Sequence, residues 1–256
     1  MTARQEVLHA SRNGSRRPAV TVAVSLYDYA AYIVDCLDSV RSQTLGSTEI
    51  IVVDDASRDD GGERAVRWMR RHGHRFVRAT LLRQMTNAGL ASARNVALEH
   101  ASAPLFFVLD ADNMIYPRCL ERLASALAAD RSSVFAYPVI EMFGDSSGLM
   151  GTPTWSRDRL AGGNYIDAMA LIRTGRLRTL GGYAQMSVPG WEDYDLWCRL
   201  ATRGWTGVRV PEILARYRTH QSSMLNTTTR REDRAAALID EMRTRHPWLT
   251  ISVGRH

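Results

Sequence analysis

The residues best suited to metal and acid–base chemistry lie in the stretch LFFVLDADN, residues 105–113. Leu105 to Leu109 form an apolar run long enough for one buried strand, and Asp110 and Asp112 follow it directly. Because an unpaired charge inside a sheet is costly, these carboxylates belong at the end of the strand. In an open α/β sheet the carboxyl end of a strand faces the crevice where ligands bind. Two such carboxylates repel each other, which favours a divalent cation; on this stretch alone, capping of the next helix explains them equally well.

The elements around this stretch predict a parallel sheet with helices on both faces. Ala19–Ser25 and Glu49–Asp55 are apolar and β-branched, and the second run ends in Asp54 and Asp55. Residues 30–43 and 117–129 have apolar side chains at helical spacing. A basic helix is expected after the loop at 56–62 and runs through Arg71, and Asn87 is a natural N-cap for another helix. The alternation of strand and helix from Ala19 to Tyr137 predicts an α/β, doubly wound, mainly parallel sheet. Two strands that end in carboxylates at one edge indicate a binding site.

Beyond residue 141 the pattern changes. Residues 143–164 form a long polar loop, Tyr165–Ile172 is expected to be a strand, and 208–210 and 213–217 are expected to be short strands. Glu192 and Asp193 open a helix, where an acidic first turn also suits the helix dipole. Residues 230–245 predict a terminal helix that packs on the body or on a surface. We therefore expect a disordered tail at 1–17, a catalytic domain at 18–225 divided into halves at 18–115 and 116–225, and a C-terminal helix and tail at 226–256.

Composition bounds the class of protein. The 256 residues carry 45% hydrophobic and 23% charged side chains, which is typical of a globular domain. The three cysteines are far apart and no apolar run has the length of a membrane span, which favours a cytoplasmic protein. The net charge of +6 rests on arginine alone, a bias that genome composition explains better than function does. No basic stripe interleaved with aromatics appears, which disfavours nucleic-acid binding, whereas the basic ends allow peripheral membrane contact.

Six motifs taken together resemble the bacterial GT-A glycosyltransferases, most closely the inverting family-2 enzymes. The resemblance covers about residues 18–224. It rests on the following segments: VSLYD at 24–28, VDDAS at 53–57, Asn87 to Asn95, Asp110-Ala-Asp112, WEDYDLW at 191–197 and YRTH at 217–220. A triplet of the form Asp-x-Asp is common by chance, so the order and spacing of all six carry the resemblance. Leu26 and Asp28 depart from the usual family pattern, which bears on the choice of donor.

The resemblance implies a donor site for a nucleotide sugar, most simply a UDP-sugar, and a Mn²⁺ or Mg²⁺ ion at the diphosphate. It implies that Asp112 and His220 are metal ligands and that Asp110 lies near the metal or the ribose. Asp55 would accept from the nucleobase, whereas Asp54 would be structural. The remaining residues implied for donor binding are Ser25, Tyr27, Asn87 and Arg94. The sugar and the acceptor, whether a glycan, a lipid-linked sugar, a peptide or a small molecule, stay open.

The same resemblance implies Asp193 as the general base, with Glu192 beside it at the acceptor or the sugar. A position at a helix N-terminus would lower the pKa of Asp193, so burial beneath Trp191 is expected to compensate. The loop at 143–164, with Trp155, would form the acceptor side or a lid. The alternatives are a sugar nucleotidyltransferase, which usually has a Gly-rich loop after the first strand, and a non-catalytic sugar-binding relative.

Overall fold

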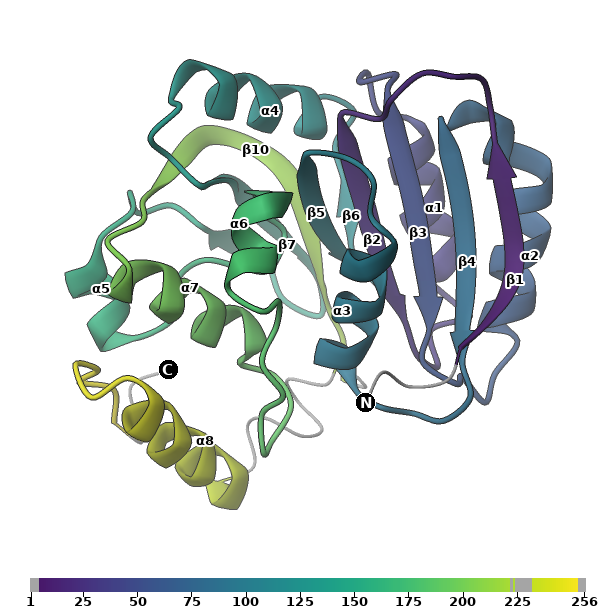
Figure 1. Ribbon diagram of the computed structural model, residues 1–256. Coiled ribbons are helices and arrows are strands. Elements are labelled where there is room, and N and C mark those ends of the chain that lie inside the picture. Colours follow the sequence, from purple (N-terminus) through teal and green to yellow (C-terminus); the bar gives the residue numbers. More distant parts are fainter. Residues whose placement is uncertain (1–4, 222, 224–231, 253–256) are drawn as a thin grey trace.

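The computed structural model describes residues 5–221, 223 and 232–252. A sheet of ten strands runs through the molecule in the order β1-β4-β3-β2-β5-β9-β7-β10-β6, and β8 pairs with β7 off this path (Figure 1). The strands are β1 (Gln5–Arg12), β2 (Val20–Leu26), β3 (Thr48–Asp54), β4 (Arg78–Gln84), β5 (Leu105–Asp110), β6 (Met114–Ile115), β7 (Phe135–Gly144), β8 (Gly148–Met150), β9 (Leu171–Arg173) and β10 (Gly207–Thr219). Strands β2 to β5 are mutually parallel, and β10 is parallel to β7. The predicted α/β, mainly parallel architecture is confirmed.

Helices cover both faces of the sheet. They are α1 (Ile33–Arg41), α2 (Gly61–His72), the 3₁₀ turn η1 (Gly73–Arg75), α3 (Leu90–His100), α4 (Cys119–Ala129), α5 (Arg157–Gly162), α6 (Thr174–Thr179), α7 (Glu192–Thr202) and α8 (Glu232–Arg245). The alternation of side chains along β2 divides the core: Val22 and Val24 pack with α1, α2 and α4, whereas Ala23 packs with α3 and α7. Both faces are therefore buried, which explains why these strands are continuously apolar.

The register of the parallel strands aligns their polar ends. Ser25 of β2 pairs with Asp110 of β5, and Leu26 pairs with Asp54 of β3. The carboxylates that follow β3 and β5 therefore lie at one edge of the sheet, as expected. Strand β9 runs antiparallel to both β5 and β7, so a single sheet joins the two predicted halves, 18–115 and 116–225.

The expectation of a disordered tail at residues 1–17 is wrong for residues 5–12, and residues 1–4 lie outside the described part of the chain. Residues 5–12 form β1, which pairs antiparallel with the edge of β4 from Gln5↔Gln84 to Arg12↔Arg78. Most of its side chains are only half-buried or exposed, and Val7 is 57% exposed. The strand is held by backbone pairing at a sheet edge, and its side chains therefore lack the apolar periodicity by which strands are recognised.

The C-terminal half differs from expectation in its details. The predicted strand at Tyr165–Ile172 shrinks to β9, and the two short strands expected at 208–217 are one strand with register shifts around Pro211. The long loop at 143–164 contains β8 and α5, and the ring of Trp155 packs edge-on against the buried Phe135 at 5.0 Å. Its middle is thus anchored to the core.

Helix α8 packs against the body of the protein, below α5 and α7 in Figure 1. Its residues Leu238, Ile239 and Met242 are buried, and His246, just after the helix, lies 3.0 Å from Asp195 of α7. The predicted start at Arg230 lies outside the described residues. Among the helices that the structure describes, none combines the length and apolar composition needed to cross a membrane.

Candidate active site

The carboxyl ends of β2, β3 and β5 open onto a cavity of about 580 Å³. Nine of the ten predicted site residues line it, and the tenth, His220, contacts one of them. The nine are Ser25, Tyr27, Asp55, Asn87, Arg94, Asp110, Asp112, Glu192 and Asp193. Other lining residues that the motifs did not single out are Tyr29, Arg58, Asp167 and Tyr217. The structure therefore gathers the dispersed motifs around one space.

At the end of the cavity formed by β2 and β3, Asp55 organises the turn that leads into α3. Its carboxylate accepts hydrogen bonds from the backbone N–H groups of Ala88 and Gly89, both at 2.8 Å, and from the Gln84 amide at 2.5 Å. Gly89, with φ +87°, is the cap of α3, so the predicted N-cap at Asn87 is two residues early. Burial raises the pKa of Asp55, and these hydrogen bonds oppose the rise. Asp54 is fully buried and accepts from the Ser57 N–H, which fits the structural role expected for it.

Near this turn, Asp28 and Arg58 form an ion pair beside Tyr27. Asp28 has a positive φ of +54°, and its carboxylate accepts from the Arg58 backbone N–H and side chain at 2.7 and 2.9 Å. The Arg58 guanidinium lies 5.6 Å from the centre of the Tyr27 ring. Tyr27 is therefore held in place as a flat wall of the cavity.

Arg94 lies beneath the floor of the cavity and pairs with Asp110. Its Nη2 lies 3.1 Å from both carboxylate oxygens of Asp110, and the arginine is only 3% exposed. The guanidinium also lies 5.2 Å from the centre of the Tyr183 ring. Since Asp110 is neutralised by a fixed cation, it is a weaker candidate for a metal ligand than the sequence suggested.

Asp112 and His220 meet across the sheet edge. His220 Nε2 lies 3.1 Å from Asp112 Oδ2, and each residue is 8% exposed. The end of β10 is fastened to the same turn, because the Arg218 N–H donates to Asn113 and the Arg218 Nε donates to the Asp112 carbonyl. The rings of Tyr29 and Tyr32 flank His220 at 5.7 and 5.2 Å. A histidine after the last strand is thus brought to the aspartate as expected.

The donor set at this point fits a divalent cation only in part. Two neighbouring ligands about 2.1 Å from an octahedral cation are about 3 Å apart, which is the separation of Asp112 and His220. Within the described residues, however, no three His, Cys, Asp or Glu side chains are arranged to hold a metal. Asp110, expected near the metal or the ribose, does not complete such a group with Asp112 and His220. A cation at this pair would need further oxygen ligands from a bound substrate or water.

Glu192 and Asp193 begin α7 at the opposite wall. Asp193 Oδ2 accepts from the Asn164 amide at 3.0 Å, and Oδ1 accepts from the Tyr194 N–H at 2.8 Å. Burial raises the pKa of Asp193 to about 6, against the opposing charge of Arg94. Glu192, 3% exposed, accepts from the Gly190 N–H, and burial raises its pKa too. Burial thus outweighs the charge of Arg94 and the two hydrogen bonds that lower the pKa, and Asp193 has a proton affinity suited to a general base near neutral pH.

Asp167 is a site residue that the sequence reasoning missed. It precedes β9, its Oδ1 accepts from the Met169 N–H at 2.8 Å, and it lines the cavity with Asp193. Burial, followed by the charge of Asp193, raises its pKa to about 7. The sequence feature that could have pointed to Asp167 is its place inside a stretch expected to be a buried strand, where a charged side chain is costly.

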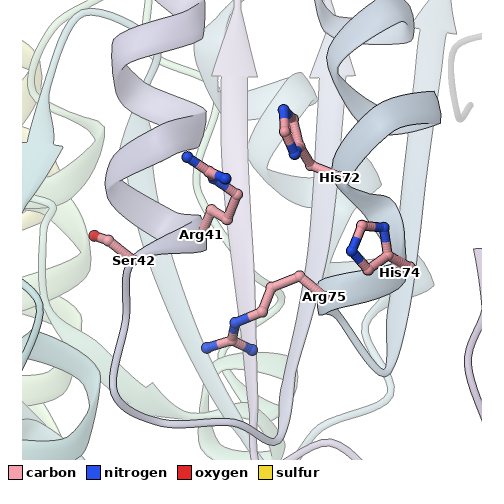
Figure 2. Close-up of a pocket in the computed structure, with 5 residues that line it drawn as sticks. All are labelled: Arg41, Ser42, His72, His74 and Arg75. Carbon is pink, nitrogen blue, oxygen red and sulfur yellow. The ribbon is translucent and has the colours of Figure 1, made fainter.

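A second hollow lies at the other end of the strands. Figure 2 shows the residues that line it: Arg41 and Ser42 from the end of α1, His72 from the end of α2, and His74 and Arg75 from η1. Arg41 pairs with Asp38, and Arg75 donates to the backbone carbonyls of Gln43 and Leu45. Arg75 thus holds the loop between α1 and β3, and Arg41 pairs within its own helix, so both arginines of this hollow have structural partners.

Comparison with known proteins identifies the family. The model of the family described as glycosyl transferase family 2 matches residues 21–178. The chain belongs to this family. It is therefore an enzyme of the glycosyltransferase class, and the expected GT-A resemblance is confirmed.

Individual relatives agree with this assignment. A putative glycosyltransferase, EpsE, of Bacillus subtilis is 28% identical over 207 residues, which cover 78% of this chain and 73% of EpsE. Chondroitin synthase of Escherichia coli is 24% identical over 193 residues, 74% of this chain but 27% of that protein. The chain thus spans most of the first relative and about a quarter of the second.

Solved structures share the fold. Residues 1–349 of TarS from S. aureus, in complex with UDP-GlcNAc, superpose with a TM-score of 0.73 at 17% identity, covering 88% of this chain and 66% of that one. The mannosyltransferase PcManGT from Pyrobaculum calidifontis, in complex with GDP-Man and Mn²⁺, gives a TM-score of 0.62 at 24% identity, covering 83% and 60%. The architecture described above is therefore that of the GT-A glycosyltransferases.

Proposed function

We propose that this glycosyltransferase moves one sugar from a nucleotide-diphosphate donor to an acceptor hydroxyl, with inversion and with help from Mn²⁺ or Mg²⁺. The observation that carries the proposal is the placement of Asp193 and of the Asp112–His220 pair around one cavity. A UDP-sugar is the simplest donor, in keeping with the UDP-GlcNAc complex of TarS. The complex of PcManGT with GDP-Man and Mn²⁺ supports the proposal of a divalent metal ion, and it is the reason to test GDP-sugars as donors as well.

In this proposal the nucleobase lies against Tyr27 and Asp55, and the diphosphate lies toward Asp112. Asp55 Oδ2 accepts one hydrogen bond, from Gly89, so a carboxylate lone pair is left for a base N–H. Asp112 and His220 would hold the metal ion, which neutralises the diphosphate as it leaves. Arg94 holds Asp110 in place.

Asp193 then takes the proton of the acceptor hydroxyl as its oxygen attacks the anomeric carbon. The bond from that carbon to the diphosphate oxygen breaks, the nucleoside diphosphate leaves with the electron pair, and the new glycosidic bond has the opposite configuration. Asn164 and the Tyr194 N–H use one lone pair on each Asp193 oxygen, so each oxygen keeps another for the proton. Glu192 lies beside the base, where it would position the acceptor or the sugar.

No observation favours the alternatives. A sugar nucleotidyltransferase would need a Gly-rich loop after β2, where this chain has Leu26-Tyr-Asp-Tyr-Ala30. A carboxylate that lines the cavity and has a pKa raised to about 6, as Asp193 has, favours a catalytic protein over a non-catalytic relative. Inversion at the anomeric carbon, a cytoplasmic location and peripheral membrane contact stay predictions. The identity of the acceptor stays open.

A thermal-shift panel tests the donor assignment. UDP-, GDP- and dTDP-sugars are added with Mn²⁺ or with EDTA. We expect at least one nucleotide sugar to raise the melting temperature, and to raise it more with Mn²⁺, since ligands that bind only the folded state stabilise it. If no nucleotide stabilises the protein under either condition, the proposal is wrong.

A further inference from the structure

The wall of the cavity around Asp193 is acidic. Four carboxylates line the cavity where β5, β9 and α7 meet: Asp110, Asp167, Glu192 and Asp193. Among the described residues that line the cavity, the cations are Arg58 and Arg94. Arg58 pairs with Asp28 beside Tyr27, and Arg94 pairs with Asp110. No arginine of this lining is therefore left to receive an anionic group at the wall that holds Asp193.

Asp167 is positioned by the rigid segment around it. Its neighbours Ile166 and Ala168 are buried, at 1% and 5% exposure. The Ile166 carbonyl accepts from the indole N–H of Trp197 at 2.8 Å, and Asp167 Oδ1 accepts from the Met169 N–H. The segment is thus fastened to α7 on one side and to its own turn on the other. One carboxylate oxygen is fixed, and Asp167 presents its carboxylate to the cavity that holds Asp193.

The proposed reaction places the transferred sugar against this wall. The anomeric carbon must lie within reach of a hydroxyl whose proton Asp193 takes, so the sugar ring lies between the Asp112–His220 pair and α7. A carboxylate in this position is a good partner for sugar hydroxyls, because a hydrogen bond to a charged acceptor is stronger than one between neutral groups. The same carboxylate repels a sugar that carries its own carboxylate.

We propose that the transferred sugar is neutral and that Asp167 accepts a hydrogen bond from one of its hydroxyl groups, thereby selecting against uronic acids. This inference rests on the proposed function, because it needs the nucleotide sugar in the cavity. It narrows the donor to hexoses, deoxyhexoses and N-acetylhexosamines. Asp167 acts as a specificity-determining residue.

Calorimetric titration of donor pairs that differ only at C6 tests the inference. The titrations are made with Mn²⁺ at pH 8, where Asp167, with its pKa raised to about 7, is ionised. The pairs are UDP-glucose and UDP-glucuronate, UDP-galactose and UDP-galacturonate, UDP-GlcNAc and its uronate, GDP-mannose and GDP-mannuronate, and dTDP-glucose and dTDP-glucuronate. UDP, GDP and dTDP alone report on the nucleotide part. We expect at least one neutral donor to bind ten times more tightly than its uronate partner. If no pair shows this preference although UDP, GDP or dTDP binds, the inference is wrong and the proposed function stands. If none of the three nucleotides binds, both fall.

Two variants test whether the preference for a neutral donor depends on Asp167 or on the acidic wall as a whole. Asp167→Asn keeps the shape and removes the charge, so we expect weaker binding of the neutral donor and a preference over the uronate reduced at least threefold. The affinity for UDP or GDP alone should stay within twofold of wild type. Asp158→Asn, an exposed carboxylate on α5, is the matched control and should change neither value. Unchanged donor affinity and unchanged preference in Asp167→Asn would overturn its assigned role.

Discussion

The imidazole of His220 lies 3.1 Å from the carboxylate of Asp112, although 108 residues separate them in the chain. The contact exists because β10 returns along β7 and pairs with β6, and Arg218 fastens its end to the turn after Asp112. The C-terminal half of the sheet thus completes a site that begins at the ends of β2, β3 and β5. This relationship makes the proposed metal dependence testable at one side chain.

His220→Ala should weaken Mn²⁺-dependent binding of the nucleotide sugar by tenfold or more, because even partners outside the metal ligands usually contribute about 10- to 100-fold to metal affinity. Binding of the same nucleotide in EDTA should change little. Calorimetry with and without Mn²⁺ measures both values. His74→Ala, an exposed histidine of η1, is the matched control. If Mn²⁺ increases the affinity of His220→Ala for the nucleotide sugar as much as it does for the wild type, His220 is not a metal ligand.

The pH dependence of catalysis should report the ionisation of Asp193. Burial raises its pKa to about 6, and only the ionised carboxylate accepts the acceptor proton. The value of kcat/KM should therefore fall as the pH decreases through about 7, where Asp167 is protonated, and fall more steeply through about 6, where Asp193 is protonated. The raised pKa also means that ionised Asp193 destabilises the folded state above its unfolded pKa, so Asp193→Asn should raise the melting temperature at pH 7.

Asn164 offers a way to shift this profile. Its amide donates to Asp193 and lowers the pKa of that carboxylate. In Asn164→Ala the acidic limb of the kcat/KM profile should therefore move to higher pH, while the affinity for UDP or GDP alone stays unchanged. An unchanged limb in a folded, active variant would assign the ionisation to another group. Asp158→Asn serves again as the control for a change elsewhere in this loop.

The C-terminal helix should contribute to the stability of the whole domain. Met242 is fully buried in the cluster that also contains Trp197 of α7 and Phe106 of β5. Truncation of such a side chain removes buried area and leaves a cavity, so Met242→Ala should lower the free energy of unfolding by about 2–5 kcal/mol. Urea unfolding measures the change, and Asp240→Ala, on the exposed side of α8, should have little effect. A loss below 1 kcal/mol would show that α8 is not part of the cooperative unit.

The sequence was most informative where burial dictates pattern. Strands β2, β3 and β5 are apolar because both faces are covered, so their positions and the carboxylates at their ends were predictable. The edge strand β1 was not, because backbone pairing with β4 holds its polar side chains in place. Residues at the ends of clear elements could be placed in the site, whereas the pairings among them depended on tertiary packing. Arg94 illustrates this, because its pairing with Asp110 could not be read from a helix motif.

Asp167 is a cavity residue that the apolar pattern of its segment did not reveal. Its stretch is apolar enough to suggest a strand over Tyr165–Ile172, but only β9 forms, and the carboxylate turns into the cavity. The carboxylate inside that stretch was the sign that the segment could not be a buried strand throughout. Trp155 belongs to the loop expected to form the acceptor side or a lid, and its ring packs against Phe135. The role of that loop stays a prediction.

The central claim is tested most directly by measuring how fast nucleoside diphosphate is released from the nucleotide sugar that raises the melting temperature. Wild-type protein with Mn²⁺ should release it, by transfer or by slow transfer to water, and EDTA should stop the release. Asp193→Asn should release nucleoside diphosphate at less than about one hundredth of the wild-type rate, since a general base contributes about 10²- to 10⁴-fold. The Kd of this variant for UDP or GDP should stay within twofold of the wild-type value. Asp193→Asn that turns over at the wild-type rate would contradict the account, as would wild-type protein that binds a nucleotide sugar and never cleaves it.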